Sequence, residues 1–145
     1  MKLALVRYGE YENSHLNDKG RRTMILAAEK LKTIVKNTNA CIISAKVARA
    51  FESAEVISKI INLSPVQTFS ELYAAEEDGI SANLKEAKKV IDTLFQKYNV
   101  IIAVTSREYI ESLPNYLLAL KNEVIHLDRG EVLIIDYEKM DLTKI

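Results

Sequence analysis

Short apolar runs alternate along this chain with longer segments in which apolar residues recur every three or four positions. The runs are typical of buried strands and cover residues 2–6, 41–44 and 100–104, with a weaker run at 65–68. The periodic segments predict helices that bury one face, over residues 17–35, 47–61, 84–98 and about 109–120. Asn17 is a good N-cap for the first helix, and Pro114 must bend the fourth or shift its start.

The C-terminal segment predicts a hairpin. Apolar residues 124–127 and 131–137 flank Asp128-Arg129-Gly130, a sequence typical of a turn. Ile134 and Ile135 would then lie on an edge strand, where a second copy could pair, so both a monomer and a homodimer stay open.

The alternation of strands and helices predicts the fold class. We expect one α/β domain over residues 1–145, a three-layer sandwich with helices on both faces of a mostly parallel sheet. The C-terminal hairpin would add an antiparallel edge. Residues 69–82 are polar and irregular, and we expect a surface loop there.

Composition and charge narrow the classes of function. The 145 residues include 20 basic and 20 acidic side chains, and this balance argues against a general nucleic-acid binder. The apolar run at the start is too short for a signal peptide or a membrane span, so we expect a cytoplasmic protein without a membrane partner. Cys41 is the one cysteine, and no Cys/His cluster has zinc-ligand spacing, so we expect neither a metal nor a cofactor.

The carboxyl ends of the predicted strands carry the candidate chemistry. In a sheet of this type ligands bind beyond these ends. Three ends should converge on one crevice: Arg7-Tyr8-Gly9, residues 44–49, and Thr105-Ser106-Arg107.

The same three segments resemble motifs of the histidine phosphatase superfamily, also called phosphoglycerate mutase-like. Leu5-Val6-Arg7-Tyr8-Gly9-Glu10 is similar to the family's Leu-Val-Arg-His-Gly-Glu, and the segments 16–22, 43–55 and 104–108 resemble its later motifs in the same order. The compact size resembles the small phosphohistidine phosphatase branch. The resemblance extends over nearly the whole chain.

The resemblance implies roles for individual residues. Arg7 and Arg49 match the two arginines that hold the phosphoryl oxygens. Tyr8 stands at the position of the nucleophilic histidine and Ser106 at that of the second histidine. Arg107 replaces the family's glycine, and either adds a third positive charge or points outward.

The acid that protonates the leaving group in some branches of the family has no clear counterpart. Ala74 falls near its expected position. Glu76 or Glu77 could substitute only if the loop shifts.

These replacements predict a protein without the family's covalent chemistry. Free imidazole offers a lone pair near neutral pH, whereas a free tyrosine side chain, with a pKa of about 10, keeps its proton. We therefore expect a catalytically inactive family member whose arginines bind a phosphate-bearing small molecule or a phosphoprotein. Two alternatives stay open: an active phosphatase that uses Tyr8 or an activated water, and an interaction module with a vestigial site.

Other side chains near the expected crevice carry weaker expectations. His15 could reach its rim but is more typical of a surface histidine, and His126 is more typical of a structural one. Glu10 or Glu12 could serve Tyr8 as a base. The tyrosines that could cluster at the crevice mouth are Tyr8, Tyr11, Tyr73 and Tyr109.

Overall fold

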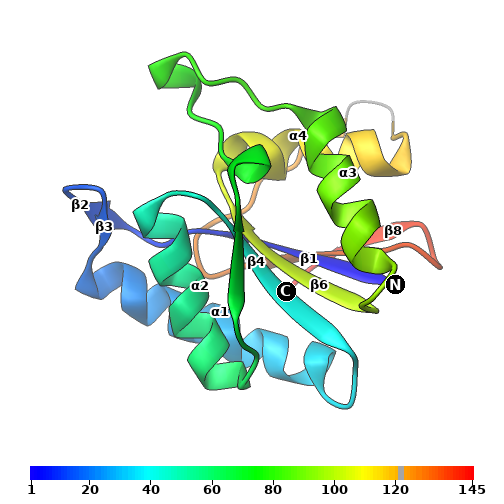
Figure 1. Cartoon of the computed structure of the whole chain (residues 1–145), viewed down its shortest axis with the longest axis horizontal. Coiled ribbons are helices and arrows are strands. Elements are labelled where there is room, and N and C mark those ends of the chain that lie inside the picture. Colours follow the sequence, from blue (N-terminus) through cyan, green and yellow to red (C-terminus); the bar gives the residue numbers. More distant parts are fainter. Residues whose placement is uncertain (121–122) are drawn as a thin grey trace.

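A six-stranded sheet forms the centre of the molecule (Figure 1). The computed structural model describes residues 1–120 and 123–145. The strands are β1 (Lys2–Arg7), β4 (Ala40–Ala45), β5 (Val66–Phe69), β6 (Val100–Thr105), β7 (Val132–Asp136) and β8 (Asp141–Lys144). They lie in the order β5-β4-β6-β1-β7-β8. The four strands from β5 to β1 are parallel to one another, whereas β7 is antiparallel to both of its neighbours, β1 and β8.

Helices cover both faces of this sheet. The helices α1 (Asp18–Val35) and α2 (Ala48–Ile61) pack against each other on one face, and α3 (Leu84–Phe95) and α4 (Arg107–Leu118) lie on the other (Figure 1). Because both faces are covered, β4 and β6 are buried along their whole length, which explains their continuous apolar sequence. The predicted three-layer α/β sandwich is confirmed.

The first helix begins where the sequence predicts. The Asn17 side chain accepts a hydrogen bond from the Gly20 N–H at 2.8 Å and so satisfies one of the free donors of the first turn of α1. The fourth helix begins earlier than predicted, at Arg107, and Pro114 lies inside it.

The predicted antiparallel C-terminal hairpin at the edge of the sheet is confirmed, and its predicted strand 131–137 matches β7, but the strand predicted at 124–127 is wrong. Residues 124–127 form no strand, although a turn does occur at Arg129 and Gly130. The hairpin joins β7 to β8 instead. Since β7 lies between β1 and β8, Ile134 and Ile135 are buried inside the sheet, and the expected edge for pairing with a second copy does not involve them.

The two predicted loops contain short elements. The loop after β1 holds a small hairpin of β2 (Tyr11–Glu12) and β3 (His15–Leu16). The segment before α3 holds two 3-10 turns, η1 (Ser70–Leu72) and η2 (Glu76–Asp78). Among residues 1–120 and 123–145, no helix has the length and apolar character needed to span a bilayer.

Candidate anion-binding site

The three strand ends predicted to converge do lie side by side. Arg7, the last residue of β1, pairs in register with Thr105, the last residue of β6, and the Tyr8 N–H donates to the Thr105 carbonyl at 3.4 Å. Ser44 of β4 pairs with Val104 on the other side of β6. The segments that carry Arg7, Arg49 and Ser106 therefore begin from three adjacent strands.

Arg49 is packed among aromatic rings. This residue lies in the first turn of α2 and is only 8% exposed. Its guanidinium carbon is 5.1 Å from the ring centre of Tyr8, 4.5 Å from that of Tyr11 and 5.9 Å from that of Tyr73. The Tyr8 and Tyr11 rings meet edge to face, with 5.8 Å between their centres. These cation–π contacts hold the guanidinium in place without a carboxylate.

Burial and the tyrosines act in opposite directions on Arg49. Burial lowers the pKa of Arg49, but the nearby hydroxyls of Tyr8 and Tyr73 outweigh that effect, so its pKa is raised overall. The guanidinium thus keeps its positive charge in a confined, partly aromatic environment.

Arg129 joins this cluster from the C-terminal part of the chain, and sequence reasoning missed it. Its Nε donates to the Tyr8 carbonyl at 3.1 Å, and its guanidinium carbon is 6.0 Å from the Tyr8 ring centre. The sequence shows Arg129 only as part of a turn, and 121 positions separate it from Tyr8. No signal in the sequence links the two.

The cluster of Arg7, Arg49 and Arg129 lacks acidic partners. Within residues 1–120 and 123–145, no ion pair of 4.0 Å or less joins any of the three to a carboxylate. The pKa of Arg7 is lowered by its burial and then by the positive charges of Arg129 and Arg107. The Glu111 carboxylate acts on the pKa of Arg7 in the opposite direction, but more weakly than these positive charges. The net positive charge here favours an anion.

Two guanidinium nitrogens and one hydroxyl oxygen in this region lack a hydrogen-bond partner within the described part of the chain. Arg7 Nε, Arg49 Nε and Ser106 Oγ are buried and form no hydrogen bond within the described part of the chain. Ser106 is fully buried and precedes α4, but its side chain does not cap the helix. Buried polar groups are nearly always paired, so these three atoms are an exception within the protein.

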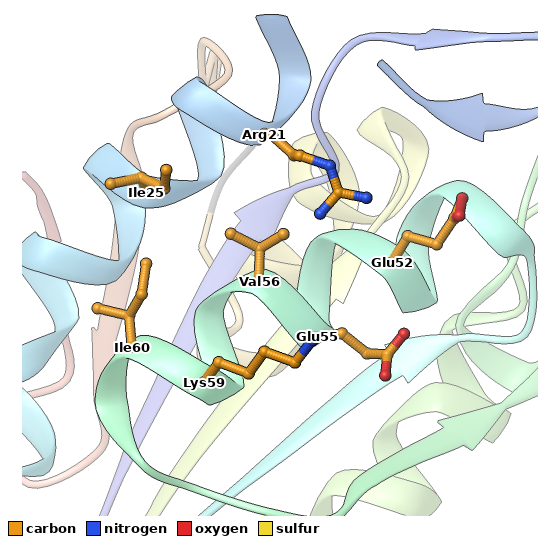
Figure 2. A pocket seen from close by; sticks show the side chains of 7 residues that line it. All are labelled: Arg21, Ile25, Glu52, Glu55, Val56, Lys59 and Ile60. Carbon is orange, nitrogen blue, oxygen red and sulfur yellow. The ribbon is translucent and has the colours of Figure 1, made fainter. Parts of the chain in front are cut away.

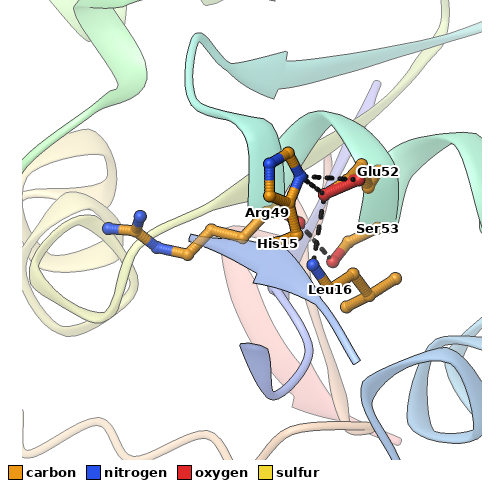
Figure 3. A network of polar contacts seen from close by, with 5 residues as sticks. All are labelled: His15, Leu16, Arg49, Glu52 and Ser53. Atoms are coloured by element: carbon orange, nitrogen blue, oxygen red, sulfur yellow. Dashed lines mark hydrogen bonds and ion pairs between the residues drawn. The ribbon is translucent and has the colours of Figure 1, made fainter. Parts of the chain in front are cut away.

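A hydrogen-bond network ties the loop after β1 to α2 (Figure 3). Ser53 Oγ accepts from the Gly9 N–H at 3.1 Å and donates to the Arg49 carbonyl at 2.7 Å. Glu52 accepts from the Leu16 N–H at 3.1 Å and pairs with His15 Nδ1 at 3.1 Å. Figure 3 shows the Arg49 guanidinium extending away from this network. The network fixes the backbone and leaves the guanidinium for other contacts.

Two glycines allow that loop to lie against α1. A Cβ atom on Gly9 would come within 2.7 Å of the Gly20 carbonyl oxygen. A Cβ atom on Gly20 would clash with the Glu10 carbonyl oxygen and with the Leu16 side chain. The closeness of these backbones sets the position of Tyr8 beside the arginines.

The remaining residues predicted for the site lie less centrally. Arg107 is near enough for its charge to act on Arg7, but its side chain is 53% exposed and its Nε is 3.7 Å from Glu111. Glu76 is exposed in η2. Tyr109 is buried and its hydroxyl accepts from the Asn83 N–H at 2.9 Å, so the expectation that it lines the crevice mouth is wrong.

The two histidines have surface partners. His15 pairs with Glu52 as described, and its side chain is largely exposed. His126 Nε2 is 2.7 Å from Asp128 Oδ1. Within residues 1–120 and 123–145, neither histidine forms a hydrogen bond or ion pair with the arginine cluster. The same residues hold no group of three or more His, Cys, Asp or Glu side chains that could bind a metal ion.

A surface hollow lies elsewhere, between α1 and α2 (Figure 2). Its volume is about 320 Å³. It is lined by Arg21 and Ile25 of α1 and by Glu52, Glu55, Val56, Lys59 and Ile60 of α2. Its floor is aliphatic and its rim carries both charges, so it lacks the concentration of positive charge found at the strand ends.

Comparison with solved structures identifies the fold of this chain. The chain superposes on the protein histidine phosphatase SixA, solved with tungstate, with a TM-score of 0.79, at 16% identity over 100% of this chain and 94% of that one. The chain has the histidine phosphatase fold. No family model and no curated protein matches it by sequence.

Two further solved structures share this fold. A phosphoserine phosphatase variant from Entamoeba histolytica, bound to phosphoserine, matches with a TM-score of 0.71 at 18% identity, over 99% of this chain and 94% of that one. A mycobacterial glucosyl-3-phosphoglycerate phosphatase, in complex with VO3, matches with a TM-score of 0.73 at 14% identity, over 99% and 96%. The histidine phosphatase fold thus spans the full described length of the chain.

Proposed function

We propose that this protein binds a phosphate-bearing ligand at the arginine cluster and has lost the covalent chemistry of the histidine phosphatases. The observation that carries the proposal is the cluster of Arg7, Arg49 and Arg129 at the carboxyl edge of the sheet, without carboxylate partners. Planar guanidinium groups bind phosphate oxygens in pairs, and this edge is where ligands bind in open α/β sheets.

The loss of covalent chemistry rests on the residues beside these arginines. Tyr8 follows Arg7, at the position where the resembled motif has the nucleophilic histidine, and Ser106 stands at the second histidine position. A phenol needs a base to attack phosphorus, and the two nearby candidates are engaged elsewhere or exposed. Glu10 accepts a hydrogen bond from Thr23 at 3.3 Å, and Glu12 is exposed on β2.

The neighbours support the type of ligand. Their structures hold tungstate, VO3 or phosphoserine. For this chain the retained arginines would hold the phosphate oxygens, while the buried Ser106 hydroxyl would add a neutral hydrogen bond. The ligand is a phosphorylated small molecule or a phosphoprotein.

Calorimetric titration with inorganic phosphate tests the binding. We expect Arg49→Gln to weaken binding by roughly 10- to 100-fold, because a hydrogen bond to a charged group contributes about 1.5–3 kcal/mol. The matched control is Arg21→Gln, an exposed arginine that lines the hollow between α1 and α2, and it should bind as the unmodified protein does. Equal affinity in Arg49→Gln and the unmodified protein, or no binding of phosphate at millimolar concentration, would contradict the proposal.

A further inference from the structure

The positive charge at the strand ends exceeds what one phosphate group requires. Arg7 and Arg49 provide two planar forks for phosphate oxygens. Arg129 adds a third guanidinium, and Arg107 a fourth positive charge that acts on Arg7. Among the described residues, the one carboxylate paired with any of the four is Glu111, 3.7 Å from Arg107 Nε, and its charge also acts weakly on Arg7.

Arg129 is held in a fixed position beside the Tyr8 ring. Its Nε donates a hydrogen bond to the Tyr8 carbonyl at 3.1 Å. This bond leaves the two terminal nitrogens of the guanidinium for other acceptors. Its guanidinium carbon lies 6.0 Å from the Tyr8 ring centre, and that of Arg49 lies 5.1 Å from the same centre. Both guanidinium groups therefore lie beside the same tyrosine ring.

The structure also explains why Arg129 does not simply repeat the role of Arg49. Arg49 is 8% exposed and packed among three tyrosines, whereas Arg129 is half-buried and lies near the ring of one, Tyr8, among the described residues. Arg129 thus lies toward the solvent side of the cluster. A group bound there would sit further out than a phosphate on Arg49.

We propose that Arg129 forms a second anion subsite, so that the ligand is a phosphate that carries a further acidic group close by, either a second phosphate or a carboxylate. This inference rests on the proposed function, because the first phosphate is held by Arg7 and Arg49. Arg107 on the exposed rim adds to the positive potential of the second subsite.

Titration with inorganic diphosphate and with orthophosphate tests the subsite. The unmodified protein should bind diphosphate at least 10-fold more tightly than orthophosphate. Arg129→Gln should remove most of that preference, because it should weaken diphosphate binding more than orthophosphate binding. Arg129→Lys, which keeps the charge, should restore part of the preference, and Arg21→Gln should leave it intact. Thermal unfolding of each variant establishes that it is folded.

The outcomes separate this inference from the proposed function. If the unmodified protein binds neither anion, both are wrong. If it binds orthophosphate and diphosphate equally well, the second subsite is wrong and the phosphate site stands. If Arg129→Gln and Arg129→Lys weaken both anions to the same extent, Arg129 only supports the Tyr8 backbone, and the subsite is again wrong.

Discussion

At the scale of single residues, the candidate site depends on one serine as much as on its arginines. The Ser53 hydroxyl joins the Gly9 N–H to the Arg49 carbonyl, and all of its contacts are buried. It therefore connects the loop that carries Tyr8 to the helix that carries Arg49. The residue itself touches no predicted ligand position.

Replacement of this serine should reduce stability. Ser53→Ala leaves the buried Gly9 N–H without an acceptor, and we expect a loss of about 1–3 kcal/mol in the free energy of unfolding. Urea denaturation measures this loss. The control is Ser112→Ala, because that hydroxyl only returns to the Glu108 carbonyl one turn earlier in α4. A Ser53→Ala variant as stable as Ser112→Ala would show that the connection contributes nothing.

The sequence allowed some of these residues to be predicted and not others. Arg7 and Arg49 stand in motifs close to the ends of apolar runs, so their convergence follows from the order of the strands. Arg129 lies in a loop after the sheet is nearly complete, and only the folded chain brings it to Tyr8. The expectation that Tyr109 lies at the crevice mouth is wrong, because its ring is buried in the core and its hydroxyl accepts from the Asn83 N–H.

At the scale of elements, the start of α1 and the loop after β1 act as a unit. Gly20 is the third residue of α1 and the Asn17 side chain caps its N–H. The Glu10 backbone lies directly against it. The β2–β3 hairpin in turn is held by Glu52 of α2. These contacts position Tyr8 and Tyr11 together.

Replacement of Gly20 by alanine should therefore destabilise the protein, although alanine has the higher helix propensity. An alanine in a helix is ordinarily more favourable than glycine by about 1 kcal/mol. Here the added Cβ would clash with the Glu10 backbone, so we expect Gly20→Ala to destabilise the protein by roughly 1–3 kcal/mol. Lys19→Ala, at the exposed neighbouring position, should stay within about 0.5 kcal/mol of the unmodified protein. Chemical denaturation measures the free energy of unfolding of both variants. A Gly20→Ala variant more stable than the unmodified protein would mean that this close packing does not exist in solution.

The wrongly predicted strand at residues 124–127 also belongs to this scale. Three of these four residues are apolar, as in a short buried strand, yet Val124 is 98% exposed and only Leu127 is buried. The sheet leaves them no partner, since both sides of β7 are taken by β1 and β8. The true last strand, β8, has only Leu142 as a large apolar residue among Asp141, Thr143 and Lys144, as suits an exposed edge.

At the scale of the whole molecule, the fold was predictable because two independent signals agree. The alternation of apolar runs with helical periodicity predicts the layers, and the order of the motifs predicts the same fold. The solved structures confirm it at low sequence identity. The ligand is not determined by this agreement, since one fold supports many chemistries.

The central claim is that the cluster of Arg7, Arg49 and Arg129 still binds phosphate and that only the reacting groups have been lost. The most direct test is turnover of a generic aryl phosphate by the unmodified protein beside the double variant Tyr8→His, Ser106→His, with thermal unfolding to show that both are folded. The account predicts no turnover by the unmodified protein and measurable turnover by the double variant. Turnover by the unmodified protein that is lost in Tyr8→Phe would contradict it and would make Tyr8 the nucleophile.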